Sequence, residues 1–250
     1  MNFLIALLIS SIAGFSTLLG SLLIFIKISK NSINKFITLC LSFSCVIMIG
    51  ISIIDLIPSS YFYIINKYSL FLGSLIAILV FLFGGWLIIL ISKKIDNNEL
   101  KTPNLYKLGV LNMIALMIHN LPEGMATFLS SYTDINLGIK LSIAIMLHNI
   151  PEGISIAIPI YYATNNKKIA LKYTFLSGFA EPIGAILAFI LFKGFINNLI
   201  ISITLILVAG IMIFLSINKI YNETLKYKEY KYIKYGFLIG ILFITISLII

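Results

Sequence analysis

Residues 114–124 read IALMIHNLPEG, and residues 143–153 read IAIMLHNIPEG. The two stretches lie 29 positions apart; eight of their eleven positions are identical, and the other three exchange aliphatic residues. In each copy Glu follows His by four positions and Asn by three, so on a helix the three side chains share one face. The repeat therefore predicts two helices with matching polar faces, formed by His119, Asn120 and Glu123 and by His148, Asn149 and Glu152.

The rest of the chain is strongly apolar. Of its 250 residues, 60% are hydrophobic and 11% are charged, whereas an ordinary soluble domain has about 25% charged residues. This supply of polar side chains is too small to cover a soluble globule, and the chain is too apolar to be disordered. The composition indicates a polytopic membrane protein.

Eight apolar runs are long enough to cross a bilayer as helices, at about 20 residues each. Strands of a membrane barrel would alternate apolar and polar residues instead. We therefore expect an all-α integral membrane protein in which residues 1–250 form one domain. The first run lacks the positive region of a signal peptide, and its apolar stretch is too long for one, so we expect it to be retained. The predicted spans are 3–26, 36–57, 69–92, 109–131, 138–162, 170–192, 196–217 and 235–250.

All 18 basic residues are lysines, and the predicted loops divide them unequally. Fifteen lie in the loops after the first, third, fifth and seventh spans, and only Lys67, Lys140 and Lys193 lie on the other side. Because cytoplasmic loops are enriched in lysine, we expect those four loops in the cytoplasm and both termini outside, in a multi-pass protein of the cell membrane. The net charge of +9 is then a topology signal, and nucleic acid is not an expected partner.

Four acidic residues and both histidines fall inside predicted spans. The acids are Asp55, Glu123, Glu152 and Glu181, and an ionisable group at the bilayer centre costs at least about 2.5–3.5 kcal/mol. The twin motifs and a third Glu-Pro pair make a functional cluster the better explanation. Asp55, near the outer end of its span, is either a solvated helix-end charge or the mouth of a pathway. Cys40 and Cys45 are expected to be apolar filler.

Prolines accompany the motifs. Pro122 and Pro151 have no N–H, so the carbonyls of Ile118 and Leu147 are left free and each helix is expected to kink. Pro182, directly after Glu181, frees the carbonyl of Gly178 in the same way. Interrupted helices with free carbonyls near the midplane coordinate ions in many transporters.

The candidate ligands are two imidazoles, three carboxylates and two amide oxygens. A nitrogen and oxygen set without thiolate favours Zn²⁺, Fe²⁺, Mn²⁺, Co²⁺ or Cd²⁺ over Cu⁺, whereas Mg²⁺ and Ca²⁺ sites use oxygen alone. Two metals that share bridging carboxylates fit this set. The metal is expected as transported substrate, and no permanent cofactor is expected.

Other functions use the same groups. An intramembrane metalloenzyme, either a hydrolase or a di-iron oxidase, would be expected to carry His-Glu-x-x-His or Glu-x-x-His, and neither occurs in the sequence. We therefore do not expect an enzyme. A passive metal channel would share every ligand with a carrier, so the sequence leaves that alternative open.

At these residues the chain resembles the ZIP family of divalent metal transporters, most closely its bacterial ZupT-like branch. HNLPEG (119–124), HNIPEG (148–153) and GFAEPIGA (178–185) carry the resemblance, together with the eight spans. It implies uptake of Zn²⁺ and related ions into the cytoplasm. It further implies a two-metal site between the fourth and fifth spans, and a four-helix transport bundle that moves against a scaffold, often in a dimer.

Carried over position by position, the resemblance names seven metal ligands. Met48 resembles a methionine that contributes to the site in the family. The loop SKKIDNNELKTPNLYK (92–107) has none of the histidines that many family members carry there. The implied ligands are His119, Asn120, Glu123, His148, Asn149, Glu152 and Glu181.

Overall fold

The computed structural model describes residues 2–96, 103–191 and 198–247, and every regular element in these ranges is helical. The ends of the predicted spans at 192, 196 and 250 lie outside the described residues. The elements are α1 (Asn2–Phe15), α2 (Thr17–Ser21), η1 (Leu22–Phe25), η2 (Lys30–Ser32), α3 (Ile33–Ile51), η3 (Ser52–Leu56), α4 (Ile57–Lys67), α5 (Leu70–Asp96), α6 (Asn104–Thr133), α7 (Ile135–Thr164), α8 (Lys167–Gly178), α9 (Ala180–Leu191), α10 (Asn198–Leu215), η4 (Ser216–Tyr221), α11 (Asn222–Lys226) and α12 (Tyr230–Ser247).

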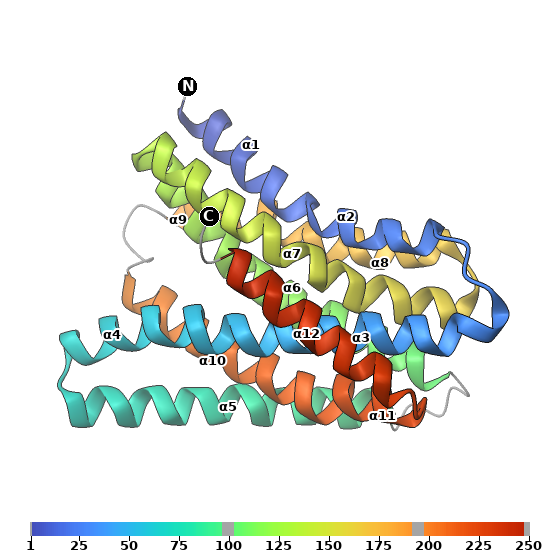
Figure 1. The fold of residues 1–250 in the computed structure, drawn as a ribbon. Helices are drawn as coiled ribbons and strands as arrows, with labels where there is room; N and C mark the ends of the chain where they lie inside the picture. Colours follow the sequence, from blue (N-terminus) through green and yellow to red (C-terminus); the bar gives the residue numbers. More distant parts are fainter. Residues whose placement is uncertain (1, 97–102, 192–197, 248–250) are drawn as a thin grey trace.

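The helices form two bundles that lie side by side (Figure 1). In the first, α6 packs against α7, α9 and α1, and α2 packs against α7 and α8. In the second, α10 packs against α5 and α4, and α12 packs against α3. The bundles meet where α3 lies along α7 and where α10 lies along α6. We call them the motif bundle and the flanking bundle.

Seven segments among the described residues are long and apolar enough to cross a membrane. They correspond to all the predicted spans except 109–131. That region is the 30-residue helix α6, whose His119, Asn120 and Glu123 reduce its hydropathy. The predicted membrane character and helical class are thus confirmed, and the count of eight spans stays a prediction.

Two π-helices extend elements of the flanking bundle. η3 begins at Ser52 and η4 at Ser216, each the last residue of a similar sequence, IMIGIS (47–52) or IMIFLS (211–216). Through them the second helical segment continues to Lys67 and the one that contains α10 to Lys226, beyond the predicted ends at 57 and 217. In η3 the N–H of Ile57 donates to the carbonyl of Ser52.

The prolines affect the helices differently. α6 and α7 each continue as one helix through Pro122 and Pro151. The predicted sixth span is instead divided into α8 and α9 at Phe179, just before Glu181 and Pro182. The first span is also interrupted, at Ser16, whose hydroxyl donates to the carbonyl of Ala13 at 2.6 Å.

Candidate metal centre

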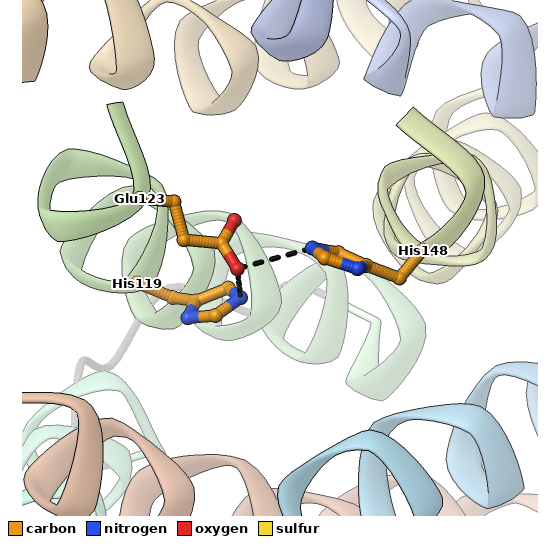
Figure 2. Close-up of side chains that lie close together, drawn as sticks. All are labelled: His119, Glu123 and His148. Carbon is orange, nitrogen blue, oxygen red and sulfur yellow. Dashed lines mark hydrogen bonds and ion pairs between the residues drawn. The ribbon is translucent and has the colours of Figure 1, made fainter. Parts of the chain in front are cut away.

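Two histidines and a glutamate converge between α6 and α7 (Figure 2). Oε1 of Glu123 lies 3.0 Å from Nε2 of His119, one turn away on α6, and 3.0 Å from Nε2 of His148 on α7. One potential ligand atom from each of the three lies within 4.8 Å of the others. All three residues are buried, with at most 8% of their surface exposed.

Glu152 adds a second carboxylate to this cluster. Its Oε1 lies 3.3 Å from Nε2 of His119, and only 1% of the residue is exposed. Neither of its carboxylate oxygens, nor Oε2 of Glu123, accepts a hydrogen bond from the described protein. Buried carboxylates without donors are strongly disfavoured, whereas a cation bound between them satisfies their charge. The arrangement therefore suits a metal ion.

Asn149 and Glu181 form an adjoining polar group. The amide nitrogen of Asn149 donates to the carbonyl of Ala13 at 2.9 Å and to Oε1 of Glu181 at 2.6 Å. That of Asn120 donates to the carbonyl of Ser177 at 3.1 Å. Because carbonyls and carboxylates only accept, both amides turn their nitrogens to these partners, and both Oδ1 atoms are left buried without a described partner. Amide oxygens are thus held as available ligands.

The motif glycines bring the other helices close. A Cβ on Gly124 would overlap the backbone of Glu181, including its carbonyl oxygen, and one on Gly153 would overlap the carbonyl oxygen of Thr17. Only glycine permits these backbone approaches. The close contact at Gly124 positions α9 against α6, so that Glu181 lies within electrostatic reach of Glu123 and Glu152.

Met48 and Asp55 lie on the flanking bundle. Met48 is fully buried in the main apolar cluster, which also contains Cys45 and Met212. Asp55 is exposed on η3 and interacts electrostatically with His148, Glu123 and His119. No described contact joins either side chain directly to the histidine and glutamate cluster.

Several supporting residues were missed from the sequence. Ala13 and Ser177 act through backbone carbonyls, which any residue type provides. Ser44 of α3 donates its hydroxyl to the carbonyl of Pro151 at 2.8 Å, a bond between the two bundles. Asn112 donates to the carbonyl of Ser155 at 2.8 Å. A signal for this last bond exists, because Pro159 lies four residues after Ser155 and removes the N–H that would otherwise bond that carbonyl.

Imidazoles and carboxylates gathered inside a bundle of membrane helices define a membrane protein that handles metal ions. Comparison with known proteins agrees with this class. The family model of the ZIP zinc transporters matches residues 92–247. The chain is 40% identical to the zinc transporter ZupT of Oceanobacillus iheyensis, covering 99% of this chain and 98% of that protein. It is 37% identical to the zinc transporter ZupT of Streptococcus mutans, covering 98% and 96%.

The chain therefore belongs to the ZIP family of zinc transporters, within its ZupT-like branch. It is a multi-pass protein of the cell membrane and a transporter rather than an enzyme. The resemblance predicted from the paired motifs is confirmed, and the metalloenzyme alternative is set aside.

Proposed function

We propose that this protein is a secondary transporter that takes up divalent transition-metal ions into the cytoplasm. Zn²⁺ is the principal substrate, and Fe²⁺, Mn²⁺, Co²⁺ and Cd²⁺ suit the same nitrogen and oxygen ligands. One observation carries the proposal: Glu123 Oε1 lies 3.0 Å from an imidazole nitrogen of each histidine inside the bundle. The family membership supports the same function.

We assign two metal positions that share carboxylates. The first uses His119, Glu123, His148 and Glu152, whose imidazole and carboxylate atoms already converge. The second uses the amide oxygens of Asn120 and Asn149 with Glu181, and Glu123 and Glu152 lie between the two as bridging ligands. Three carboxylates offset most of the charge of two dications, which a site inside the membrane requires.

The topology in this proposal has eight spans, with α6 as the fourth, and both termini outside. The connections after η1, α7 and α11, which contain or adjoin lysines, lie together at one end of the molecule, on the right in Figure 1. Cysteine labelling tests the orientation, since the native Cys40 and Cys45 are buried. A thiol at Ser69→Cys should react from outside intact cells, and one at Lys226→Cys only after permeabilisation; the opposite pattern would invert the topology.

Transport involves movement of the motif bundle against the flanking bundle. All seven assigned ligands lie on the motif bundle, where glycines hold the backbones in direct contact. Across the interface with the flanking bundle, α3 and α7 meet largely through apolar side chains, with the bond from Ser44 to Pro151 among them. Such a boundary favours sliding of two rigid bodies. Met48 and Asp55 then belong to the pathway, with Asp55 on its outer side.

Uptake of radioactive Zn²⁺ by proteoliposomes tests the function. Wild-type vesicles should accumulate zinc with saturable kinetics and show counterflow from preloaded vesicles, whereas a passive channel would show neither. Glu123→Gln and Glu152→Gln should abolish uptake, and Glu229→Gln, an acid in the turn before α12, should leave it unchanged. Uptake that persists in both cluster variants would refute the assigned site. Cross-linking in membranes tests the homodimer that the family resemblance implies.

A further inference from the structure

Three buried asparagines of the motif bundle share one hydrogen-bonding pattern. Asn120 and Asn149 anchor their amide nitrogens to backbone carbonyls and leave Oδ1 without a described partner. Asn112 does the same: its nitrogen donates to the carbonyl of Ser155 at 2.8 Å, and its Oδ1 is buried and accepts no hydrogen bond from the described protein. The first two are assigned metal ligands, and the third lies outside that site.

Asn112 lies on the same face of α6 as His119. The seven positions between them are two helical turns, about 10 Å along the axis, toward the lysine-rich end of the molecule. The residue is 0% exposed. Pro159 explains why its nitrogen is needed, because Ser155 would otherwise have an unsatisfied carbonyl. Pro159 does not explain why Oδ1 of Asn112 is buried without a described partner.

The surroundings of Asn112 on α6 are apolar. Leu111, Ala115 and Leu116 belong to the main hydrophobic cluster, as does Ile156 beside Ser155 on α7. An amide oxygen in such an environment is costly without a polar ligand. Beyond Asn112, Leu108 and Leu111 line a cavity of about 360 Å³ at the lysine-rich end. Its polar lining includes Glu223, which pairs with Lys226 at 2.6 Å, and also Lys107 and Lys219. Along α6, Asn112 lies between the cavity-lining Leu108 and Leu111 and the candidate ligand His119.

We propose that Oδ1 of Asn112 is a transient coordination point for a partly hydrated divalent cation that passes between the metal centre and the cytoplasmic cavity. This inference rests on the proposed function. A neutral amide oxygen attracts a dication less than a carboxylate does, so it holds the ion briefly and lets it leave. Asn112 therefore lowers the free-energy barrier for release of the ion toward the cytoplasm, and it adds nothing to the affinity of the metal centre.

Two substitutions test this role. Asn112→Leu keeps the approximate volume and removes the oxygen, together with the nitrogen that donates to Ser155. We expect uptake of Zn²⁺ to fall about tenfold, the effect of losing one polar contact to the ion. The dissociation constant for Zn²⁺ in detergent should equal that of the wild type. Asn112→Asp puts a carboxylate at the same point, so we expect it to bind one additional Cd²⁺ per chain in equilibrium dialysis and to transport more slowly.

Thr174→Val is the matched control. Thr174 is a buried residue of α8 whose hydroxyl donates to the carbonyl of Ala170 at 3.0 Å, so this variant loses a buried polar group away from the pathway and should transport normally. Wild-type uptake by Asn112→Leu, or unchanged Cd²⁺ stoichiometry in Asn112→Asp, would overturn the inference. If Asn112→Leu does not fold, the Cd²⁺ stoichiometry of Asn112→Asp alone decides whether the inference holds. Failure of the proposed function would appear separately, as absent wild-type uptake or normal uptake by Glu123→Gln.

Discussion

Exchange of Glu123 for glutamine keeps the shape of the side chain and removes one negative charge from the centre of the cluster. Oε1 of Glu123 lies 3.0 Å from Nε2 of both His119 and His148, so an ion held by those nitrogens also contacts this oxygen. Zinc binding should therefore depend on Glu123 more than on any carboxylate that faces a single histidine.

The size of the effect follows from the charges around the site. Two dications carry four positive charges and the three carboxylates supply three negative ones, so Glu123→Gln leaves one further unit of positive charge uncompensated. Two unit charges about 4 Å apart interact by about 4 kcal/mol at an effective dielectric constant of about 20. At about 1.4 kcal/mol per tenfold, Glu123→Gln should raise the zinc dissociation constant about a thousandfold.

Isothermal titration calorimetry of the detergent-solubilised protein measures this constant directly. Glu229→Gln, which removes a charge in the lysine-rich turn before α12, serves as the control and should bind zinc as the wild type does. Thermal unfolding of both variants without metal shows whether the fold is retained. A folded Glu123→Gln protein whose affinity falls by less than tenfold would refute the assignment of Glu123 as the shared ligand.

Four other outcomes are expected. Gly153→Ala should destabilise the protein by about 1–2 kcal/mol, because overpacking outweighs the gain in helix propensity; Gly240→Ala, where a Cβ has 3.1 Å to its nearest neighbour, should change thermal stability by less than half as much. Asn149→Leu should reduce the zinc stoichiometry measured by dialysis from two to one, because Glu181 loses its partner ligand. Zinc affinity measured by calorimetry should fall as pH decreases, since metal-bound imidazoles must be neutral and protons compete with the metal for them. Ser44→Ala should raise the maximal uptake rate severalfold without a change in zinc affinity, because the bond to Pro151 that holds the bundles in this arrangement is lost.

The convergence of the histidines and Glu123 was largely predictable because its signal is local. Helical spacing alone puts His119 and Glu123 on one face, and the repeat at 148–152 implies an equivalent face on the next helix. The structure brings the two faces together. The apolar runs likewise predict membrane helices, since no soluble structure suits them.

Other features depend on contacts that leave no local pattern. Ser44, Ala13 and Ser177 act on helices distant in sequence, and two of these three use only backbone carbonyls. The prolines did not reveal where helices are interrupted: α7 continues through Pro151, whereas the sixth span is divided at Phe179, just before Pro182. Neighbouring helices decide which response each proline produces.

The π-helices at 52–56 and 216–221 have a consequence for sequence alignment and engineering. A π-turn amounts to an α-helix with one residue inserted, and each residue rotates the helix by about 100°. Because the π-turn accommodates the extra residue, deletion of Ile53 alone would restore ordinary winding and leave α4, including Ser60 and Ile64, on the faces that they now bury. Relatives without this insertion would need their next apolar stripe shifted by one position to present the same surface.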